Sequence, residues 1–127
     1  MKRNFLSTAI LAMFSLSASA AFDWSSFFAN EPICVQLSID HKDHPIDRHA
    51  PALLPVLGYD NNTFVLSVPY ELEDVTIVIR DEDGLVLYYD VVSSITDYYM
   101  FLLTDDIIAD MYSIELYYGD WHLYGEF

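Results

Sequence analysis

Short runs in which apolar and polar side chains alternate dominate residues 54–127, and this alternation constrains the fold more than any other feature. The runs are rich in β-branched and aromatic residues, and turn-forming residues separate them at intervals of about 8 to 12 residues. Alternation with period two places successive side chains on opposite faces of a strand. The region therefore predicts about seven strands arranged as an antiparallel sandwich or barrel, without a helix of convincing length.

The last predicted hairpin closes at Gly119-Asp120, where a glycine in first position favours a two-residue type II′ turn. This turn fixes which residues face each other across the two strands. One set of facing residues is polar or mixed and is expected to face solvent: Tyr117 with His122, Glu115 with Tyr124, and Ser113 with Glu126. The other set is apolar and is expected to face the core: Leu116 with Leu123, Ile114 with Gly125, and Tyr112 with Phe127.

Two further hairpins precede it. Asn61-Asn62 is expected to form a type I′ turn that pairs residues 56–60 with residues 63–68, because Asn tolerates positive φ. Tyr59 then faces Phe64, and Leu57 faces Leu66. In the middle hairpin, a type I turn with Gly84 in the left-handed region would place Ile79 opposite Leu87 and Ile77 opposite Tyr89, whereas a four-residue loop would shift this register by one.

Two segments are expected to cross between sheets. They are residues 69–74, which begin with a proline that interrupts strand pairing, and residues 104–110. Seven strands with two crossovers favour an immunoglobulin-like antiparallel β-sandwich over residues 51–127. Asp110-Met111-Tyr112 predicts a tyrosine corner at the start of the penultimate strand. The chain has one cysteine, so the core is expected to be held by packing alone.

Three motifs carry a resemblance to a known family: Ile79-Arg80-Asp81-Glu82-Asp83-Gly84, Tyr112-Ser113-Ile114-Glu115-Leu116 and Leu123-Tyr124-Gly125-Glu126-Phe127. Together with the export signal described below, they resemble the small secreted immunoglobulin-like proteins of unknown function from gut-dwelling Gram-negative anaerobes. The resemblance implies the sandwich fold and carries no catalytic or binding residues. Such proteins usually have Gly where this chain has Asp110. A second resemblance, to the β-sandwich sorting tails of secreted bacterial enzymes, ranks lower because those tails follow a large cargo domain.

Residues 1–20 are predicted to be a cleaved signal peptide and not part of the fold. Lys2 and Arg3 precede an apolar stretch, and Ala18-Ser19-Ala20 has the small-x-small pattern of a cleavage site. The apolar stretch is shorter than the roughly 20 residues that a membrane span needs. The mature protein is therefore expected to be secreted or periplasmic and not inserted in a membrane. Residues 21–50 would then form an N-terminal edge strand or tail followed by a polar linker.

The charge of the chain excludes several kinds of partner. The formal charge is −15, and removal of Lys2 and Arg3 deepens it to −17. Nucleic acids and anionic membranes bind clustered Lys and Arg, which this chain lacks. We therefore expect an unknown protein or glycan partner, and a monomer or weak oligomer. Many of the acids fall in predicted turns and connectors, where they are expected to form turns and maintain solubility.

The linker histidines, the cysteine and one acidic turn each have a chemical and a structural interpretation. His41, His44 and His49 lie in a linker interrupted by Pro45, and their spacing matches no helical histidine pair, so a solvated linker is the default and a metal site the alternative. Cys34 is expected to be a small apolar residue of a strand. Asp81-Glu82-Asp83-Gly84 continues into apolar residues 85–87 and not into the twelve-residue pattern of alternate acidic ligands and a final Glu that a calcium loop needs, so it is expected to be a hairpin turn. The sequence therefore assigns no metal ligand and no cofactor.

The outward-facing tyrosines are the best binding candidates. Tyr117, Tyr124 and one of Tyr88 or Tyr89 could form a platform for a sugar or protein, although Tyr is also simply a good strand residue. The common catalytic motifs are absent, and the short loops leave little chain for a deep cleft. A pair of glycosidase carboxylates has no local signature, so that class stays open. The sequence favours a non-enzymatic binding or structural module; the alternatives are a sorting or anchoring domain, or a metal-binding protein using the three linker histidines.

Overall fold

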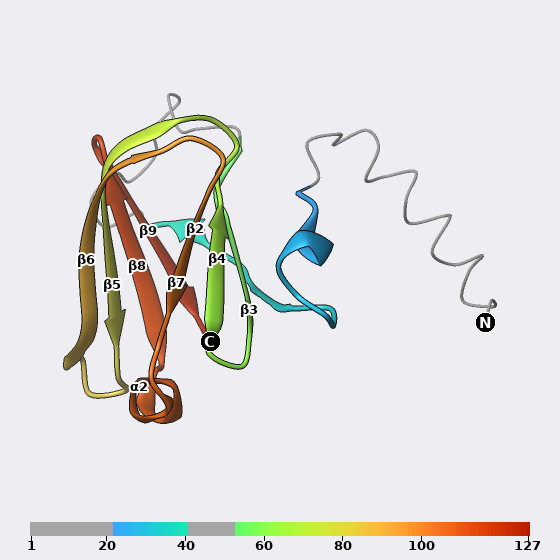
Figure 1. Cartoon of the computed structure of the whole chain (residues 1–127). Coiled ribbons are helices and arrows are strands. Elements are labelled where there is room, and N and C mark those ends of the chain that lie inside the picture. The colour runs from blue at the N-terminus through green and yellow to red at the C-terminus, as the bar shows by residue number, and fades with distance from the viewer. Residues whose placement is uncertain (1–21, 41–52) are drawn as a thin grey trace.

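The computed structural model describes residues 22–40 and 53–127. In that part of the chain, nine strands form two antiparallel sheets that face each other (Figure 1). The expected immunoglobulin-like sandwich is therefore confirmed. Residues 54–127 supply seven of these strands, and residues 33–39 supply the other two. The predicted signal peptide lies outside the described residues.

The first sheet has four strands, in the order β1-β3-β4-β7. Asn61-Asn62 closes the β3-β4 hairpin in the predicted register, with Tyr59 opposite Phe64 and Leu57 opposite Leu66. The predicted turn type is wrong, because only Asn61 has positive φ and a type I′ turn needs two such residues. The strands are β1 (Ile33–Val35), β3 (Val56–Asp60), β4 (Thr63–Ser67) and β7 (Tyr98–Leu102).

The second sheet has five strands, in the order β2-β9-β8-β5-β6. Its β8-β9 hairpin has the predicted register, including Leu116 opposite Leu123 and Tyr117 opposite His122. Gly119 has φ +56° and Asp120 does not have positive φ, as expected for a type II′ turn. The strands are β2 (Ser38–Ile39), β5 (Leu72–Arg80), β6 (Val86–Ile95), β8 (Ser113–Tyr118) and β9 (Trp121–Glu126).

The predicted register of the β5-β6 hairpin is correct only beside its turn. Arg80 lies opposite Val86, but a bulge between Ile79 and Arg80 shifts every later pair by one. Ile79 therefore faces Tyr88, and Ile77 faces Asp90; the shift comes from the bulge and not from a longer loop. Because side chains alternate, the shift places Tyr88 and Asp90 on the inner face and Tyr89 on the outer face.

Residues 33–39 cross from one sheet to the other. β1 pairs with β3 in the four-stranded sheet, and β2 pairs with β9 in the five-stranded sheet. The crossing passes so close to Gly125 that a Cβ there would lie 2.8 Å from the Gln36 carbonyl oxygen. Glycine therefore allows the N-terminal run to close this side of the sandwich.

Both predicted crossovers connect the two sheets. Residues 104–110 contain a short helix that the sequence analysis did not predict, α2 (Asp105–Asp110). The predicted tyrosine corner is wrong: Tyr112 is 39% exposed, and its hydroxyl faces the Glu126 carboxylate, which raises the Tyr112 pKa. One 3-10 helix, η1 (Trp24–Ser26), precedes β1. No helix within the described ranges has the length and apolar character needed to span a membrane.

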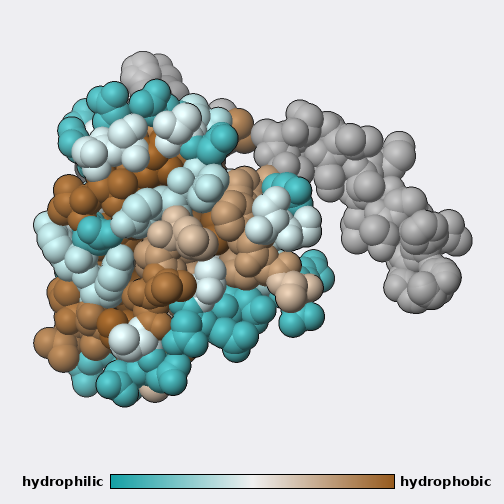
Figure 2. Space-filling view, in the orientation of Figure 1, coloured by the Kyte–Doolittle hydropathy of each residue, from teal (hydrophilic) through white to brown (hydrophobic). Residues whose placement is uncertain are grey.

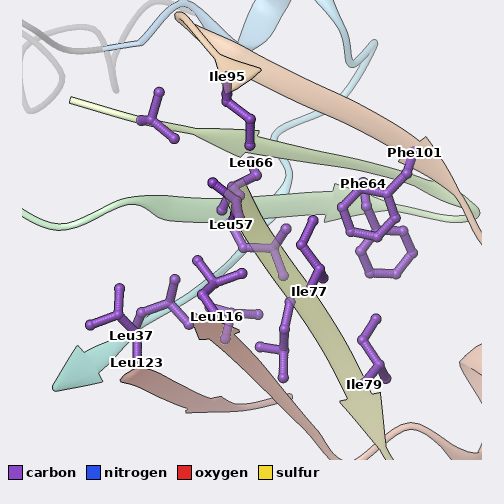
Figure 3. Packing of buried hydrophobic residues seen from close by; sticks show 14 of the residues in the cluster. Leu37, Leu57, Phe64, Leu66, Ile77, Ile79, Ile95, Phe101, Leu116 and Leu123 are labelled. Atoms are coloured by element: carbon purple, nitrogen blue, oxygen red, sulfur yellow. The ribbon is translucent and has the colours of Figure 1, made fainter. Parts of the chain in front are cut away.

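The core lies between the two sheets. Leu57 and Leu66 of the four-stranded sheet point toward Ile77 and Leu116 of the five-stranded sheet (Figure 3). These four side chains are fully buried. Full burial of one such side chain contributes about 1.5–3 kcal/mol to the free energy of unfolding. The core is held by packing, since the chain's one cysteine, Cys34, is free.

Candidate ligand-binding surface

The outer face of the four-stranded sheet is covered by residues 22–28, which we call the N-terminal cap. Gly58 and Val65 face each other across β3 and β4 on this outer side. Trp24 packs so closely on Gly58 that a Cβ at this position would lie 2.8 Å from the indole ring. Val65 is fully buried although it points away from the core, and Phe28 of the cap is buried as well. We call this surface the covered face.

Aromatic contacts hold the cap in place. The rings of Phe22 and Phe27 stack with centroids 5.5 Å apart. The centroid of the Phe27 ring lies 4.7 Å from that of the Tyr98 ring of β7. Asp23 caps η1 by accepting a hydrogen bond from the Ser25 backbone N–H at 3.2 Å. Hydrogen bonds from the Ser25 and Ser26 side chains lower the Asp23 pKa. The cap is therefore an ordered aromatic layer on the covered face.

The outer face of the five-stranded sheet, which we call the open face, carries an ionic network in place of a cap. Arg80 Nε donates to Glu115 Oε1 at 2.9 Å, and Arg80 also donates to the Gly84 carbonyl oxygen at 3.0 Å. The hydrogen bond to Glu115 raises the Arg80 pKa. Val78, which points outward opposite Glu115, is only 4% exposed.

His122 connects this network to Asp40, the residue that follows β2. Its Nδ1 lies 3.2 Å from Asp40 Oδ2, and its Nε2 lies 3.4 Å from Glu115 Oε2. A neutral imidazole has one N–H and can donate to one of these carboxylates, whereas an imidazolium can donate to both. Asp40 N–H also donates to the His122 carbonyl oxygen at 2.8 Å. The network therefore fastens the end of β2 to β9, and its charged groups contact one another.

The structure places the candidate tyrosines on the open face. Tyr117 is 36% exposed, and its ring stacks on His122 with centroids 4.2 Å apart. Tyr124 is half-buried and donates to Glu126 Oε2 at 3.0 Å. Tyr89 is 63% exposed, while its neighbour Tyr88 packs against the core.

The inner edge of β6 carries a polar contact that sequence reasoning missed. Asp90 accepts a hydrogen bond from the Tyr99 hydroxyl of β7 at 2.6 Å and one from the Tyr88 hydroxyl at 3.2 Å. The hydrogen bond to Asp90 raises the Tyr99 pKa to about 12. Burial raises the Tyr88 pKa above its ordinary value. Tyr88 also stacks on Phe101 at 5.3 Å. These contacts, which depend on the β-bulge, join the two sheets along this side.

An exposed apolar row follows the outer side of β6. Figure 2 shows hydrophobic surface along the side of the molecule where β6 lies. β6 is an edge strand, and β5 is the one strand of the described part that pairs with it. The row consists of Leu85, Val86, Tyr89 and Val91, which are 64%, 45%, 63% and 55% exposed.

The remaining candidates provide no site within residues 22–40 and 53–127. His41, His44 and His49 lie outside the described residues, so their role stays a prediction, and the described residues contain no group of three side chains able to hold a metal. Asp81 accepts hydrogen bonds from the backbone N–H groups of Asp83 and Leu85 at 2.9 and 2.8 Å, as expected for a turn.

Cys34 lies in β1, as predicted for a strand residue, and its side chain is exposed. Partial burial raises the Cys34 pKa, which disfavours the reactive thiolate. An open hollow of about 310 Å³ lies between residues 34–37 and residues 54–56, and Cys34 is the titratable residue of its wall. This hollow therefore lacks an acid-base pair.

Comparison with known proteins identifies a family and a fold. A family model described as a domain of unknown function, DUF3244, matches residues 35–127. The chain is also similar to a DUF3244 family protein from Bacteroides vulgatus, whose crystal structure is described as an immunoglobulin-like β-sandwich. The two share 21% sequence identity with a TM-score of 0.56, over 76% of this chain and 96% of the other. No curated protein matches the chain.

Proposed function

The chain belongs to the DUF3244 family, for which no function is described, and we propose that it is an exported, non-enzymatic module that binds another protein through the exposed side of β6. The predicted signal peptide supports export. The absence of an acid-base pair in the hollow and the mutual pairing of the charged groups on the open face support a role without catalysis. The predicted resemblance to a family of immunoglobulin-like proteins of unknown function is confirmed, and export stays a prediction.

The observation that carries this proposal is the exposed apolar row on an edge strand. Isolated exposed apolar residues are ordinary, but three of these four lie on one strand and the fourth directly precedes it. Large aromatic and aliphatic side chains of this kind supply most of the binding energy in protein interfaces. The row lies on the open face, where β5 separates it from Tyr117 of β8, so a partner that covers β6 can also reach Tyr117.

The same surface is less suited to a glycan. A sugar that stacks on a tyrosine needs an accessible ring face with polar groups around it. His122 already covers one face of the Tyr117 ring, and the Tyr124 hydroxyl is bonded to Glu126. The most exposed ring, Tyr89, has the aliphatic Val91 as its neighbour on the outer face. These contacts favour a polypeptide over a carbohydrate.

The test is a binding screen of the full chain against a peptide library and a glycan array. We expect peptide ligands whose binding is lost when Tyr89 and Val91 are both replaced by serine. Leu102→Ser is the matched control, because Leu102 is 67% exposed on β7, an edge strand of the other sheet. Thermal denaturation of each variant would verify that the fold is intact. Ligands that are all glycans, or peptide binding unchanged in the Tyr89/Val91 variant, would overturn the proposal.

A further inference from the structure

We propose that β6 binds an extended, positively charged segment of another protein as an additional strand of the five-stranded sheet. This inference rests on the proposed function and names the ligand class for the same surface. It depends on three features of the described residues: the free backbone of β6, the arrangement of its side chains, and the charges at its two ends.

The backbone of β6 is the longest free edge in the described part of the sandwich. β6 has ten residues, whereas the other edge strands, β7, β1 and β2, have five, three and two. In an edge strand, every second residue directs its N–H and C=O away from the neighbouring strand. Natural edge strands are usually short or protected by Lys, Pro, a bulge or an inward-pointing charge. β6 contains neither Lys nor Pro, and its bulge lies at the end next to the turn. Its inward-pointing charge, Asp90, is bonded to two tyrosine hydroxyls.

The side chains of β6 match the two faces of an incoming strand. Val86, Tyr89 and Val91 lie on the outer face, opposite Arg80, Val78 and Thr76. Asp90 lies between Tyr89 and Val91 and points to the inner face, where its Oδ2 accepts the two tyrosine hydroxyls. An added strand would therefore place apolar side chains beside Tyr89 and Val91, and one side chain of opposite parity beside Asp90. A lysine or arginine is the residue that complements Asp90.

Acidic residues at both ends of β6 select the charge of the partner. Asp81, Glu82 and Asp83 form the turn before the strand. At its far end, Glu73 lies opposite Ser94, whose hydroxyl donates to Glu71 at 3.2 Å, and Asp97 follows the strand. Arg80, the cation nearest the turn, is already paired with Glu115.

The same charges disfavour a second copy of this chain as the occupant. Pairing β6 with β6 of another copy brings an acidic end against an acidic end in either strand direction. Like charges in these positions repel, and the formal charge of −15 on each copy adds to the repulsion. A basic segment has the opposite effect, so its affinity should fall as ionic strength rises.

The experiment uses the full chain and synthetic ten-residue peptides in which valine alternates with lysine. A matched peptide carries glutamate in place of each lysine. Two further peptides carry N-methyl groups on every second amide, one on the odd and one on the even positions, because N-methylation removes the donor that a strand ladder needs. Affinity is measured by calorimetry, and backbone protection by hydrogen exchange.

We expect the lysine peptide to bind and the glutamate peptide to bind at least tenfold more weakly. One N-methylated peptide should lose at least tenfold in affinity while the other is little changed, and amides of β6 should gain protection. Tyr89→Lys should weaken binding at least tenfold, since it removes an apolar contact and adds a like charge. Leu102→Lys on β7 is the control with the same charge change and should have little effect.

The outcomes separate the two proposals. Peptide binding that depends on Tyr89, without sensitivity to N-methylation or protection of β6, would overturn strand addition and leave the proposed function standing. Equal binding of the lysine and glutamate peptides would overturn the charge preference. Binding unaffected by Tyr89→Lys, or no binding by any peptide, would overturn strand addition; the library screen above then decides the proposed function.

Discussion

The two outer faces of the sandwich keep water away from their outward-facing apolar residues in different ways. The covered face has small and apolar residues, Gly58 and Val65, and the N-terminal cap excludes water from them. The open face has longer polar side chains, and Val78, which lies opposite Glu115 of the Arg80-Glu115-His122 network, is buried there. The difference indicates that a covering segment is needed only where the outward side chains are too small or too apolar to keep water from the strands.

The strongest test of this comparison places the same charge on each face. Val65→Asp would bury a carboxylate beneath the cap, and we expect it to lower the free energy of unfolding by about 3–5 kcal/mol. Thr76→Asp on the open face is the matched variant and should cost less than about 1 kcal/mol. Urea denaturation of both variants measures the difference. Similar losses in the two variants would show that the open face is also closed to water.

Removing the cap's buried ring tests the cover directly. Phe28→Ala should lower the free energy of unfolding by about 3 kcal/mol, because a buried phenylalanine is lost and Val65 gains access to water. Tyr89→Ala on the open face should change it by less than about 0.5 kcal/mol, since that ring is largely exposed. Calorimetric melting of the two proteins gives both values. A Phe28→Ala protein as stable as the parent would mean that the cap contributes no cover.

The ionic network should contribute less to the free energy of unfolding than the cap does. Its contribution should come from Glu115, which contacts both Arg80 and His122. Glu115→Ala removes the partner of Arg80 and one partner of His122, and we expect a loss of about 2 kcal/mol. Glu126→Ala, at an exposed position on the neighbouring strand, is the control and should be close to neutral. Equal effects of the two substitutions would remove the reason for treating the network as the shield of the open face.

The smallest expected effect concerns a contact between the two sheets, where the Tyr99 hydroxyl of one sheet donates a hydrogen bond to Asp90 of the other. Tyr99→Phe should cost about 1 kcal/mol below pH 9. The folded pKa of Tyr99, about 12, lies above its ordinary value of 10.0, so the stability linked to this proton is fully present below pH 10 and is lost as the pH rises from 10 to 12.

The Tyr99→Phe protein should therefore lose less stability than the parent over this interval, as chemical denaturation at pH 9 and pH 11.5 would show. Tyr89→Phe is the control, because the Tyr89 side chain lies on the opposite face of the strand. An identical alkaline loss in the parent and the Tyr99→Phe protein would exclude this hydroxyl as its source.

Local chemistry allowed much of the fold to be predicted. Gly119-Asp120 sets the β8-β9 register and Asn61-Asn62 sets the β3-β4 register, because a two-residue turn leaves one way to align its strands. The longer β5-β6 turn does not have this property, and the bulge at Arg80 moved the register by one residue. The sequence pattern therefore anticipated Tyr117 and Tyr124 on the outer face, but not Asp90 between two tyrosines.

The sequence by itself determined the seven strands of residues 54–127, two of the three hairpin registers and two of the connections between the sheets, since each depends on neighbouring residues. The tertiary structure alone decided which surfaces are covered. It placed Trp24 over Gly58, joined Asp40 to His122, and left the long edge of β6 exposed. These contacts connect residues far apart in the chain, where no local turn or periodicity constrains the partner, so they follow only from how the two sheets and the N-terminal segment pack.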